Sequence, residues 1–308
     1  MEFNIDYKKD FNNLFICKIY DDNYYGYKYK YKLCKNIIDN QLGGMIEEKK
    51  RFIVKFNAKK VIKSKSKYIK ISQNQLQILD ALLNDGSQKK YLDSDKKFRY
   101  SEHSGLFDFD NSKLERIVVS GKTTREDRDD SDILLPHNMS DAIDYEYMFH
   151  THPPTPYSGA RAIGGILYEF PSISDLYHFA YHYNEGHIQG SMIIAPEGIY
   201  IIKMKENIKY IDYPSNKIAN KMEKINYTIQ EKSILKYGTD FSNHRQKIFY
   251  DSVAQDKTYI KMYNKMVKKF FNPNMIIFYK PREYDRKINK WIIKNLYIKV
   301  EPVQIEYS

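Results

Sequence analysis

The sequence predicts an α+β protein in which a mixed or antiparallel sheet is flanked by helices. Three observations support this class: a helical pattern begins at Ser72, several short strand patterns follow it, and a second helix at Ser172 precedes two strands that form a hairpin. Strands and helices do not alternate regularly, as they would in a parallel βαβ series, and the sequence has no internal repeat.

A β-rich segment is expected over residues 1–70, because short apolar and polar stretches alternate there and turn signals such as Gly43-Gly44 separate them. From Ser72 the apolar residues follow a helical period instead, and Ser72 or Asn74 can cap that helix. The apolar residues on its one face are Leu76, Ile78, Leu79, Leu82 and Leu83.

The next elements complete a domain that we expect over residues 71–210. Three strand patterns cover residues 98–110, 113–122 and 144–152, and a long charged loop covers 122–140. A helix then begins near Ser172. Two apolar runs around the turn at residues 196–198 form the hairpin.

A basic, mainly helical C-terminal region is expected over residues 211–308. Residues 217–237 and 245–271 have helical patterns. Two strand patterns, at 275–280 and 295–307, close the chain. These boundaries carry an uncertainty of about ten residues when they are read from patterns alone.

The composition is that of a globular protein, since 42% of the 308 residues are hydrophobic and can build a real core. Tyr, Phe, Lys, Ile and Asn are common, a bias typical of AT-rich genomes such as those of large DNA viruses or parasites. The chain has no run of eighteen apolar residues and begins with charged ones, so we expect a soluble intracellular protein without a membrane partner, in the host cytoplasm or the virion if it is viral. Cys17 and Cys34 are too few for a disulfide framework and are expected to be reduced and buried.

The net charge of +11 is distributed unevenly. Residues 49–70 contain ten Lys or Arg and no acid, residues 101–150 contain twelve acids against five bases, and residues 257–299 are basic again. The basic flanks indicate a possible acidic protein or nucleic-acid partner, although solvated lysine-rich faces would produce the same pattern.

His150 and His152 end a strand pattern and are two residues apart, so their side chains leave the same face and can share one metal ion. Pro153 and Pro154 end the strand at once and leave the two imidazoles at an edge open to solvent. Asp175 lies in the first turn of the next helix, where the helix dipole favours a carboxylate. Two histidines and one carboxylate leave a fourth position for water, which is typical of a catalytic zinc site.

Each of these patterns also has an ordinary structural interpretation. A His-x-His pair on a strand can simply be hydrogen-bonded, and Ser172 with Asp175 is what a helix capping box looks like. A second metal site is also conceivable, because Asp175, His178 and His182 share one helical face, but the Glu that follows the first His in a zincin helix is missing there. Packing among neighbouring tyrosines explains His178 and His182 as well.

Together, the string HTHP at 150–153 and PSISDL at 171–176 resemble the His-x-His-Pro and Ser-x-x-Asp signature of the JAB/MPN (JAMM) metalloproteases. The resemblance covers roughly residues 72–205 and implies a JAB/MPN-like mixed sheet. It also implies that His150, His152 and Asp175 bind zinc and that Ser172 helps to hold the oxyanion. A glutamate on an earlier strand, often followed by glycine, is the general acid/base of that family, and Glu102 before Gly105 fits this place.

The sequence departs from the family pattern in one respect. About seven residues usually separate the Pro from the Ser, whereas residues 154–171 separate Pro153 from Ser172 here. An insertion at this place would lie beside the metal, so we expect a substrate flap or a lid. The assignment of Glu102 also has competitors, because Glu115, Glu126 and Glu146 precede the histidines as well.

The resemblance implies a zinc-dependent amide hydrolase, most often an isopeptidase that removes ubiquitin or a ubiquitin-like protein from lysine. Zinc would lower the pKa of water from about 15.7 towards 7, and Glu102 would accept the proton and pass it to the leaving amine. The main alternative is a catalytically silent JAB-like scaffold that binds partners through its basic flanks. A nucleic-acid-binding protein is a third hypothesis, which rests on the basic stretches alone and has no recognised motif.

Overall fold

The computed structural model describes residues 58–62, 67–88, 90–92, 98–110, 112–120, 145–153, 161–186, 188–206, 208–241, 246–301 and 303–307. The chain forms two compact units, one of residues 1–67 with 301–308 and one of residues 68–300. The larger unit therefore contains the predicted domain over 71–210 together with most of the predicted C-terminal region. Strands predicted before residue 58, both cysteines and the charged loop over 122–140 lie outside the described residues.

The smaller unit contains one described pair of strands. Strand β1 (Ala58–Ile62) runs antiparallel to β14 (Val303–Tyr307), and Lys60 lies opposite Ile305. Two segments that lie far apart in the sequence thus form one antiparallel ladder.

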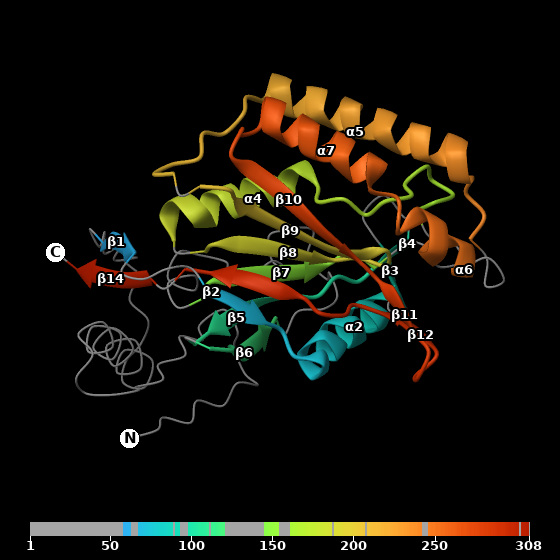
Figure 1. Ribbon diagram of the computed structural model, residues 1–308. Helices are drawn as coiled ribbons and strands as arrows, with labels where there is room; N and C mark the ends of the chain where they lie inside the picture. Colours follow the sequence, from blue (N-terminus) through green and yellow to red (C-terminus); the bar gives the residue numbers. More distant parts are fainter. Residues whose placement is uncertain are drawn as a thin grey trace, which may run out of the picture. The chain divides into compact units, whose positions relative to one another are not determined.

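A six-stranded sheet forms the centre of the larger unit, in the order β10-β9-β8-β7-β5-β6 (Figure 1). All neighbours are antiparallel except β7 and β8, which are parallel. Parallel neighbours need a crossover, and helix α4 between them in the sequence supplies it. The predicted α+β class with a mixed sheet is confirmed. The strands are β5 (Ser104–Phe109), β6 (Leu114–Val119), β7 (Tyr147–Thr151), β8 (Gly190–Ile194), β9 (Gly198–Met204) and β10 (Met275–Pro281).

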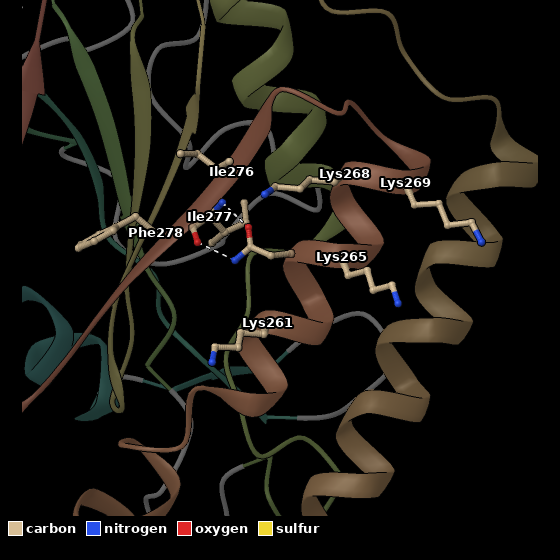
Figure 2. Close-up of a pocket in the computed structure, with 8 residues that line it drawn as sticks. Lys261, Lys265, Lys268, Lys269, Ile276, Ile277 and Phe278 are labelled. Carbon is tan, nitrogen blue, oxygen red and sulfur yellow. Dashed lines mark hydrogen bonds between the residues drawn. The ribbon is translucent and has the colours of Figure 1, made fainter.

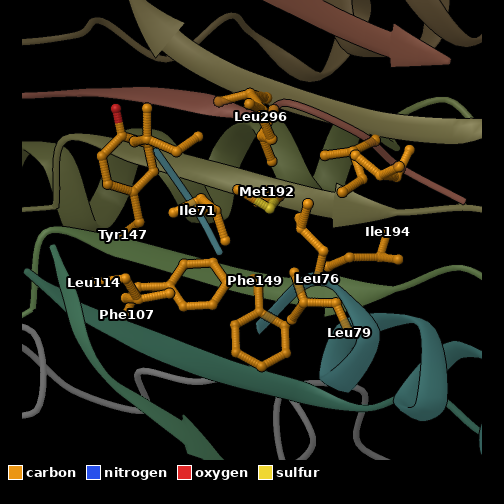
Figure 3. Packing of buried hydrophobic residues seen from close by; sticks show 14 of the residues in the cluster. Ile71, Leu76, Leu79, Phe107, Leu114, Tyr147, Phe149, Met192, Ile194 and Leu296 are labelled. Atoms are coloured by element: carbon orange, nitrogen blue, oxygen red, sulfur yellow. The ribbon is translucent and has the colours of Figure 1, made fainter. Parts of the chain in front are cut away.

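Helix α2 (Gln73–Gln88) covers one face of this sheet. Of the residues predicted on its apolar face, Leu76, Leu79 and Leu83 are buried against strand residues such as Phe149 and Met192 (Figure 3). Leu82 is partly buried against the same core, whereas Ile78 is exposed, so its predicted place on this face is wrong. Strand β2 (Lys67–Lys70) pairs with β13 (Tyr297–Val300) and adds Ile69 and Ile298 to the same core. The larger unit also contains two small antiparallel pairs of strands: β3 (Lys90–Leu92) with β4 (Phe98–Tyr100), and β11 (Glu283–Asp285) with β12 (Lys290–Ile292).

Helices α4 (Ile173–Glu185), α5 (Asn216–Tyr237) and α7 (Lys257–Phe270) lie on the other side of the sheet from α2 (Figure 1). Helix α4 buries Leu176, Phe179 and Ala180 and contacts β8. Helix α7 lies along the edge strand β10, and α5 packs on α7. The short helix α6 (Gln246–Ile248) and a π-helical turn (Phe249–Val253) lead into α7.

Helices make up the described part of the predicted C-terminal region up to Phe270, and strands follow from Met275. One of them, β10, extends the central sheet beside β9, with Ile277 opposite Ile202. This region therefore completes the sheet that carries the site. Among the described residues, no helix combines the length and the apolar character that crossing a membrane requires.

Candidate metal centre

His150 is the penultimate residue of strand β7, and His152 directly follows the final residue of that strand, Thr151. The strand is fixed on both sides, because Thr151 N donates to His103 O at 2.8 Å and His152 N donates to Ile194 O at 2.8 Å. Both imidazoles leave the same side, as the spacing predicts, and their Nε2 atoms lie 3.1 Å apart. Both side chains are buried, so the expected position at an edge open to solvent is wrong, and the pair lies inside the protein beside α4.

Asp175 reaches the histidines from the first turn of α4. Its Oδ1 lies 3.1 Å from His150 Nε2 and its Oδ2 lies 3.5 Å from His152 Nε2. Asp175 Oδ2 also accepts a hydrogen bond of 2.5 Å from Ser172 N, while Ser172 Oγ accepts one of 3.1 Å from Asp175 N. This capping box fixes the start of the helix and, with it, the position of the carboxylate.

These three side chains could hold a metal ion. Their potential ligand atoms lie within 4.8 Å of one another, and no other group of three His, Cys, Asp or Glu among the described residues does this. All three are buried, and ionisable side chains are seldom fully buried unless they are paired with one another or with a metal ion. Two imidazole nitrogens and a carboxylate oxygen are donors that a divalent transition metal accepts.

The electrostatics of the site depend on the carboxylate. Burial disfavours a charged imidazole, but the hydrogen bond and charge of Asp175 outweigh burial and raise the pKa of His152 to about 9, with smaller contributions from Glu102 and Glu169. Burial likewise favours a neutral carboxyl, but His150 and His152 hold the pKa of Asp175 well below its usual range. Without a metal, the cluster is thus an ion pair, and a bound cation would take the place of the imidazolium proton.

His152 is oriented by a backbone carbonyl. Its Nδ1 lies 3.3 Å from Glu169 O, and because a carbonyl can only accept, Nδ1 must carry the hydrogen of this contact. In the neutral ring, Nε2 then keeps the lone pair that faces Asp175 and His150. Such an outer partner fixes both the tautomer and the ring orientation of a metal ligand.

Glu102 lies two residues before β5, and therefore just outside the strand on which the sequence places it. It is half-buried and precedes Ser104, which is directly opposite His150 in the β5–β7 ladder. Its charge favours the protonated form of His152, which places the carboxylate within electrostatic reach of the site. The structure thus brings Glu102 to the end of the sheet that carries the histidines.

Two competing glutamates lie at the other end of the same strands. Glu146 precedes β7 and accepts a hydrogen bond of 2.8 Å from Phe109 N, and Glu115 is exposed near the start of β6. About four strand residues, or roughly 13 Å, separate Glu146 from His150. Glu126, the third competitor, lies outside the described residues.

Ser172 is the N-cap of α4, so the capping interpretation of Ser172 and Asp175 is confirmed. Its hydroxyl also lies 2.6 Å from Ser174 Oγ. The second metal site considered on α4 is not assembled: both oxygens of Asp175 face His150 and His152, and the rings of His178 and His182 form an edge contact with each other at 4.6 Å. His178 and His182 therefore have the packing role that the sequence left open.

The described part of the predicted insertion is a packed strap, which we define as residues 161–171. Its turn near Ile163 is exposed, but its second half is buried. It therefore differs from the free flap that the sequence predicts; residues 154–160 lie outside the described residues. The buried strap residues are Ala162, Leu167, Tyr168, Glu169, Phe170 and Pro171.

Side chains from distant parts of the chain fasten the strap. Gln230 of α5 accepts hydrogen bonds from the backbone N–H groups of Leu167 and Tyr168 at 2.9 and 3.1 Å and donates one to Tyr168 O at 2.7 Å. Tyr263 of α7 donates to Pro171 O at 2.5 Å. Gln230 and Tyr263 were not predicted as site residues, since their role depends on tertiary contacts and no local pattern marks them.

Glu169 of the strap and Glu197 form a buried carboxylate pair. Glu197, in the β8–β9 turn, accepts hydrogen bonds from Glu169 N at 2.7 Å and from the Tyr200 hydroxyl at 2.5 Å. Burial, followed by the negative charge of Glu169, raises the pKa of Glu197 to about 7, although the Tyr200 hydrogen bond opposes this. Arg161 Nη1 lies 3.3 Å from Glu169 Oε2 and offsets part of the negative charge.

Comparison with known proteins identifies one informative relative. "Uncharacterized protein R413" of Acanthamoeba polyphaga mimivirus is 34% identical over 252 residues, which cover 80% of this chain and 68% of that protein. No protein-family model matches the chain, and no solved structure matches it. The relative comes from a giant virus, the kind of source that the residue bias indicates. At this identity and coverage, the chain belongs to the same family as the mimivirus protein R413.

Proposed function

We propose that the protein is a zinc-dependent amide hydrolase of the JAB/MPN type, and that it acts as an isopeptidase on ubiquitin or ubiquitin-like conjugates. The observation that carries the proposal is the buried cluster of His150, His152 and Asp175, whose ligand atoms lie within 4.8 Å of one another. Stability alone does not require such a cluster, because a buried ion pair is seldom more stabilising than apolar residues of the same volume.

Zinc fits this donor set better than calcium or magnesium does. Calcium and magnesium prefer shells made of oxygen, whereas two imidazole nitrogens with one carboxylate form a known three-ligand catalytic zinc set. The contact of His152 Nδ1 with Glu169 O leaves Nε2 available to a metal. A bound zinc ion would supply Lewis acidity, which polarises a carbonyl group and lowers the pKa of water.

Glu102 is the proposed general acid/base. It lies at the histidine end of the sheet, and its charge acts on His152. In hydrolysis it would accept a proton from the attacking water and then deliver that proton to the leaving nitrogen, so that a free amine and a carboxylate are the products. Half-burial leaves its carboxylate accessible to substrate while still limiting its solvation.

Ser172 would assist at the carbonyl oxygen. Its hydroxyl accepts from Asp175 N, so the hydroxyl hydrogen remains available to donate to a developing oxyanion or to Ser174. The order of elements also supports the JAB/MPN type, because a helix, a strand that Glu102 precedes, a histidine strand and an aspartate helix follow one another here, similar to the order in that family.

The test combines metal content with cleavage. The purified full chain should contain about one zinc per molecule, and it should release ubiquitin from chains of at least one linkage, with activity lost to a chelator and restored by zinc. Glu102→Gln should retain zinc but lower turnover by about 10²-fold or more. Glu115→Gln is the matched control, since this glutamate is exposed at the other end of the sheet, and it should retain full activity.

Two outcomes would contradict this proposal. If the zinc-loaded protein cleaves none of a panel of ubiquitin chains, ubiquitin-like conjugates and linear peptides, the chain is better described as a catalytically silent scaffold. If Glu102→Gln cleaves at the normal rate, another group serves as the base, and Glu102 has no catalytic role.

A further inference from the structure

We propose that the groove between α7 and the edge strand β10 is a docking site for an acidic protein segment that carries apolar side chains. The groove has a volume of about 730 Å³ and is open to solvent (Figure 2). Its two walls differ in chemistry. Helix α7 contributes four lysines, Lys261, Lys265, Lys268 and Lys269, and β10 contributes the apolar residues Ile276, Ile277 and Phe278.

The lysines lie on the solvent side of α7 because its apolar side faces the protein. Tyr259, Tyr263 and Val267 are buried on the inner side of the helix. Lys261 and Lys268 reach from the helix towards β10 (Figure 2). Within the described residues, Lys261, Lys265 and Lys268 form no ion pair, and no acidic residue lines the groove. A row of like charges without counter-charges attracts a partner of opposite sign.

The apolar wall sets the second requirement for the partner. Phe278 is 46% exposed, and its side chain leaves β10 on the side away from α7, so it extends the apolar surface beyond the outer edge of the groove (Figure 2). Lys203 Nζ lies 6.0 Å from the Phe278 ring centre, so the positive potential extends to this wall as well. A segment that places carboxylates against the α7 lysines and an apolar side chain over β10 would contact both kinds of surface, whereas a phosphodiester backbone would leave Ile276 uncovered.

The partner is expected to bind through side chains and not as an added strand. Asn264 of α7 accepts from Ile277 N and donates to Ile277 O, both at 2.7 Å, and thereby occupies the outer edge of β10 (dashed lines in Figure 2). A bridging side chain of this kind protects an edge strand from pairing with another chain. Strand addition would have to break both bonds.

The groove lies on the opposite side of α7 from the strap. Tyr263, on the inner side, donates to Pro171 O next to α4, whereas the lysines face outward. Substitutions in the groove should therefore leave the metal cluster intact. The inference does not depend on the proposed function.

The test uses the full chain and three fluorescent probes of equal net charge: a peptide in which glutamates alternate with leucines, a polyglutamate peptide and a single-stranded oligothymidylate. Fluorescence anisotropy gives the affinity of each. We expect the Glu/Leu peptide to bind most tightly and to weaken as salt rises from about 50 to 200 mM. The combined variant Lys261→Glu, Lys265→Glu and Lys268→Glu should weaken it by about tenfold or more.

The matched control reverses three exposed lysines of the neighbouring helix α5, Lys217, Lys224 and Lys232, with the same change of net charge. This control should weaken binding much less than the α7 variant does, because the α5 lysines do not line the groove and act on the peptide only through the screened long-range field. Phe278→Ser should reduce the affinity for the Glu/Leu peptide to that for polyglutamate. Circular dichroism checks the fold, and the corresponding Lys→Gln triple replaces the reversal if the reversal does not fold.

Three results would overturn the inference. The first is an equal loss of affinity in the α5 control, which would mean that net charge alone drives binding. The second is tighter binding of the oligothymidylate with loss in the α7 variant, which would make the groove a nucleic-acid surface. The third is the absence of measurable binding to the Glu/Leu peptide at low salt.

Discussion

Gln230→Leu tests whether the strap positions the metal site. Leucine has a similar volume and a good helix propensity, so α5 should persist. The substitution removes the two hydrogen bonds that Gln230 accepts from Leu167 N and Tyr168 N and the one that it donates to Tyr168 O. Three buried backbone groups then lose their partner at once, next to the carbonyl of Glu169 that orients His152.

The expected cost follows from these three groups. A buried polar group without a partner costs about 1–3 kcal/mol, so the lower end gives about 3 kcal/mol of unfolding free energy in total. For a unit of this size, that corresponds to a fall in Tm of roughly 6–12 °C. Loss of the outer partner of a metal-binding histidine typically lowers metal affinity by about 10–100-fold. Gln230→Leu should therefore weaken zinc binding as well as the fold.

The assay measures both quantities. Competition with a chromophoric chelator gives the zinc affinity of the folded protein at a temperature well below its Tm, and thermal melts with and without zinc give the stability. Ser233→Ala is the matched control, because Ser233 is buried one turn further along α5 and its hydroxyl bonds only within the helix, to Gln230 O at 2.7 Å. If Gln230→Leu lowers Tm but binds zinc as tightly as Ser233→Ala does, the strap does not position His152.

Three further predictions concern single side chains. Asp175→Asn keeps the shape of the side chain but removes its charge, so the variant should lose bound zinc. Elemental analysis of the purified protein measures the zinc content. Retention of one zinc per chain would contradict the proposed ligand set. Ser172→Ala should lower stability by about 1 kcal/mol, because the helix cap is lost. It should also lower turnover by about ten- to a hundredfold at unchanged zinc content. A loss of stability with normal turnover would mean that Ser172 is only a cap. Glu197→Gln should change the pH dependence of stability. The pKa of Glu197 in the folded state is raised to about 7, so the wild-type protein takes up a proton on folding. It therefore loses up to about 3 kcal/mol of unfolding free energy as pH rises from about 4.5 to 7. Melts at both ends of this range should show a smaller loss in the variant, and equal slopes would refute the raised pKa.

Much of the fold could be predicted because its signals are local. The apolar period after Ser72 indicates α2, and the apolar runs around the Pro196 turn indicate the β8–β9 hairpin. The spacing of His150 and His152 likewise requires only that β7 be a strand. The pairing of Asp175 with these histidines could be expected only through the resemblance to a known family, since a turn of helix and a strand end meet through tertiary packing.

Other features could not be predicted from local patterns. Strand β10 has the same apolar pattern as any short strand, and nothing in its sequence indicates that it lies beside β9, more than seventy residues earlier in the chain. Lysines at helical spacing in α7 fit either a solvated face or a binding surface. The structure adds the apolar wall of β10, which converts a charge pattern into a groove with two kinds of wall.

The strap explains how this chain accommodates a long connection between its histidine strand and its aspartate helix. Eighteen residues join Pro153 to Ser172, and a connection of that length has many conformations to lose if it must hold a carbonyl against His152. Backbone hydrogen bonds within the strap close only its turn, from Gly165 N to Ala162 O and from Ile166 N to Arg161 O. Its buried half receives partners from α5 and α7 through Gln230 and Tyr263. The C-terminal helices therefore help to position the candidate metal centre, although they supply no proposed ligand. A truncation after β9 would remove both partners and should disturb His152 even though it removes none of the three proposed ligands.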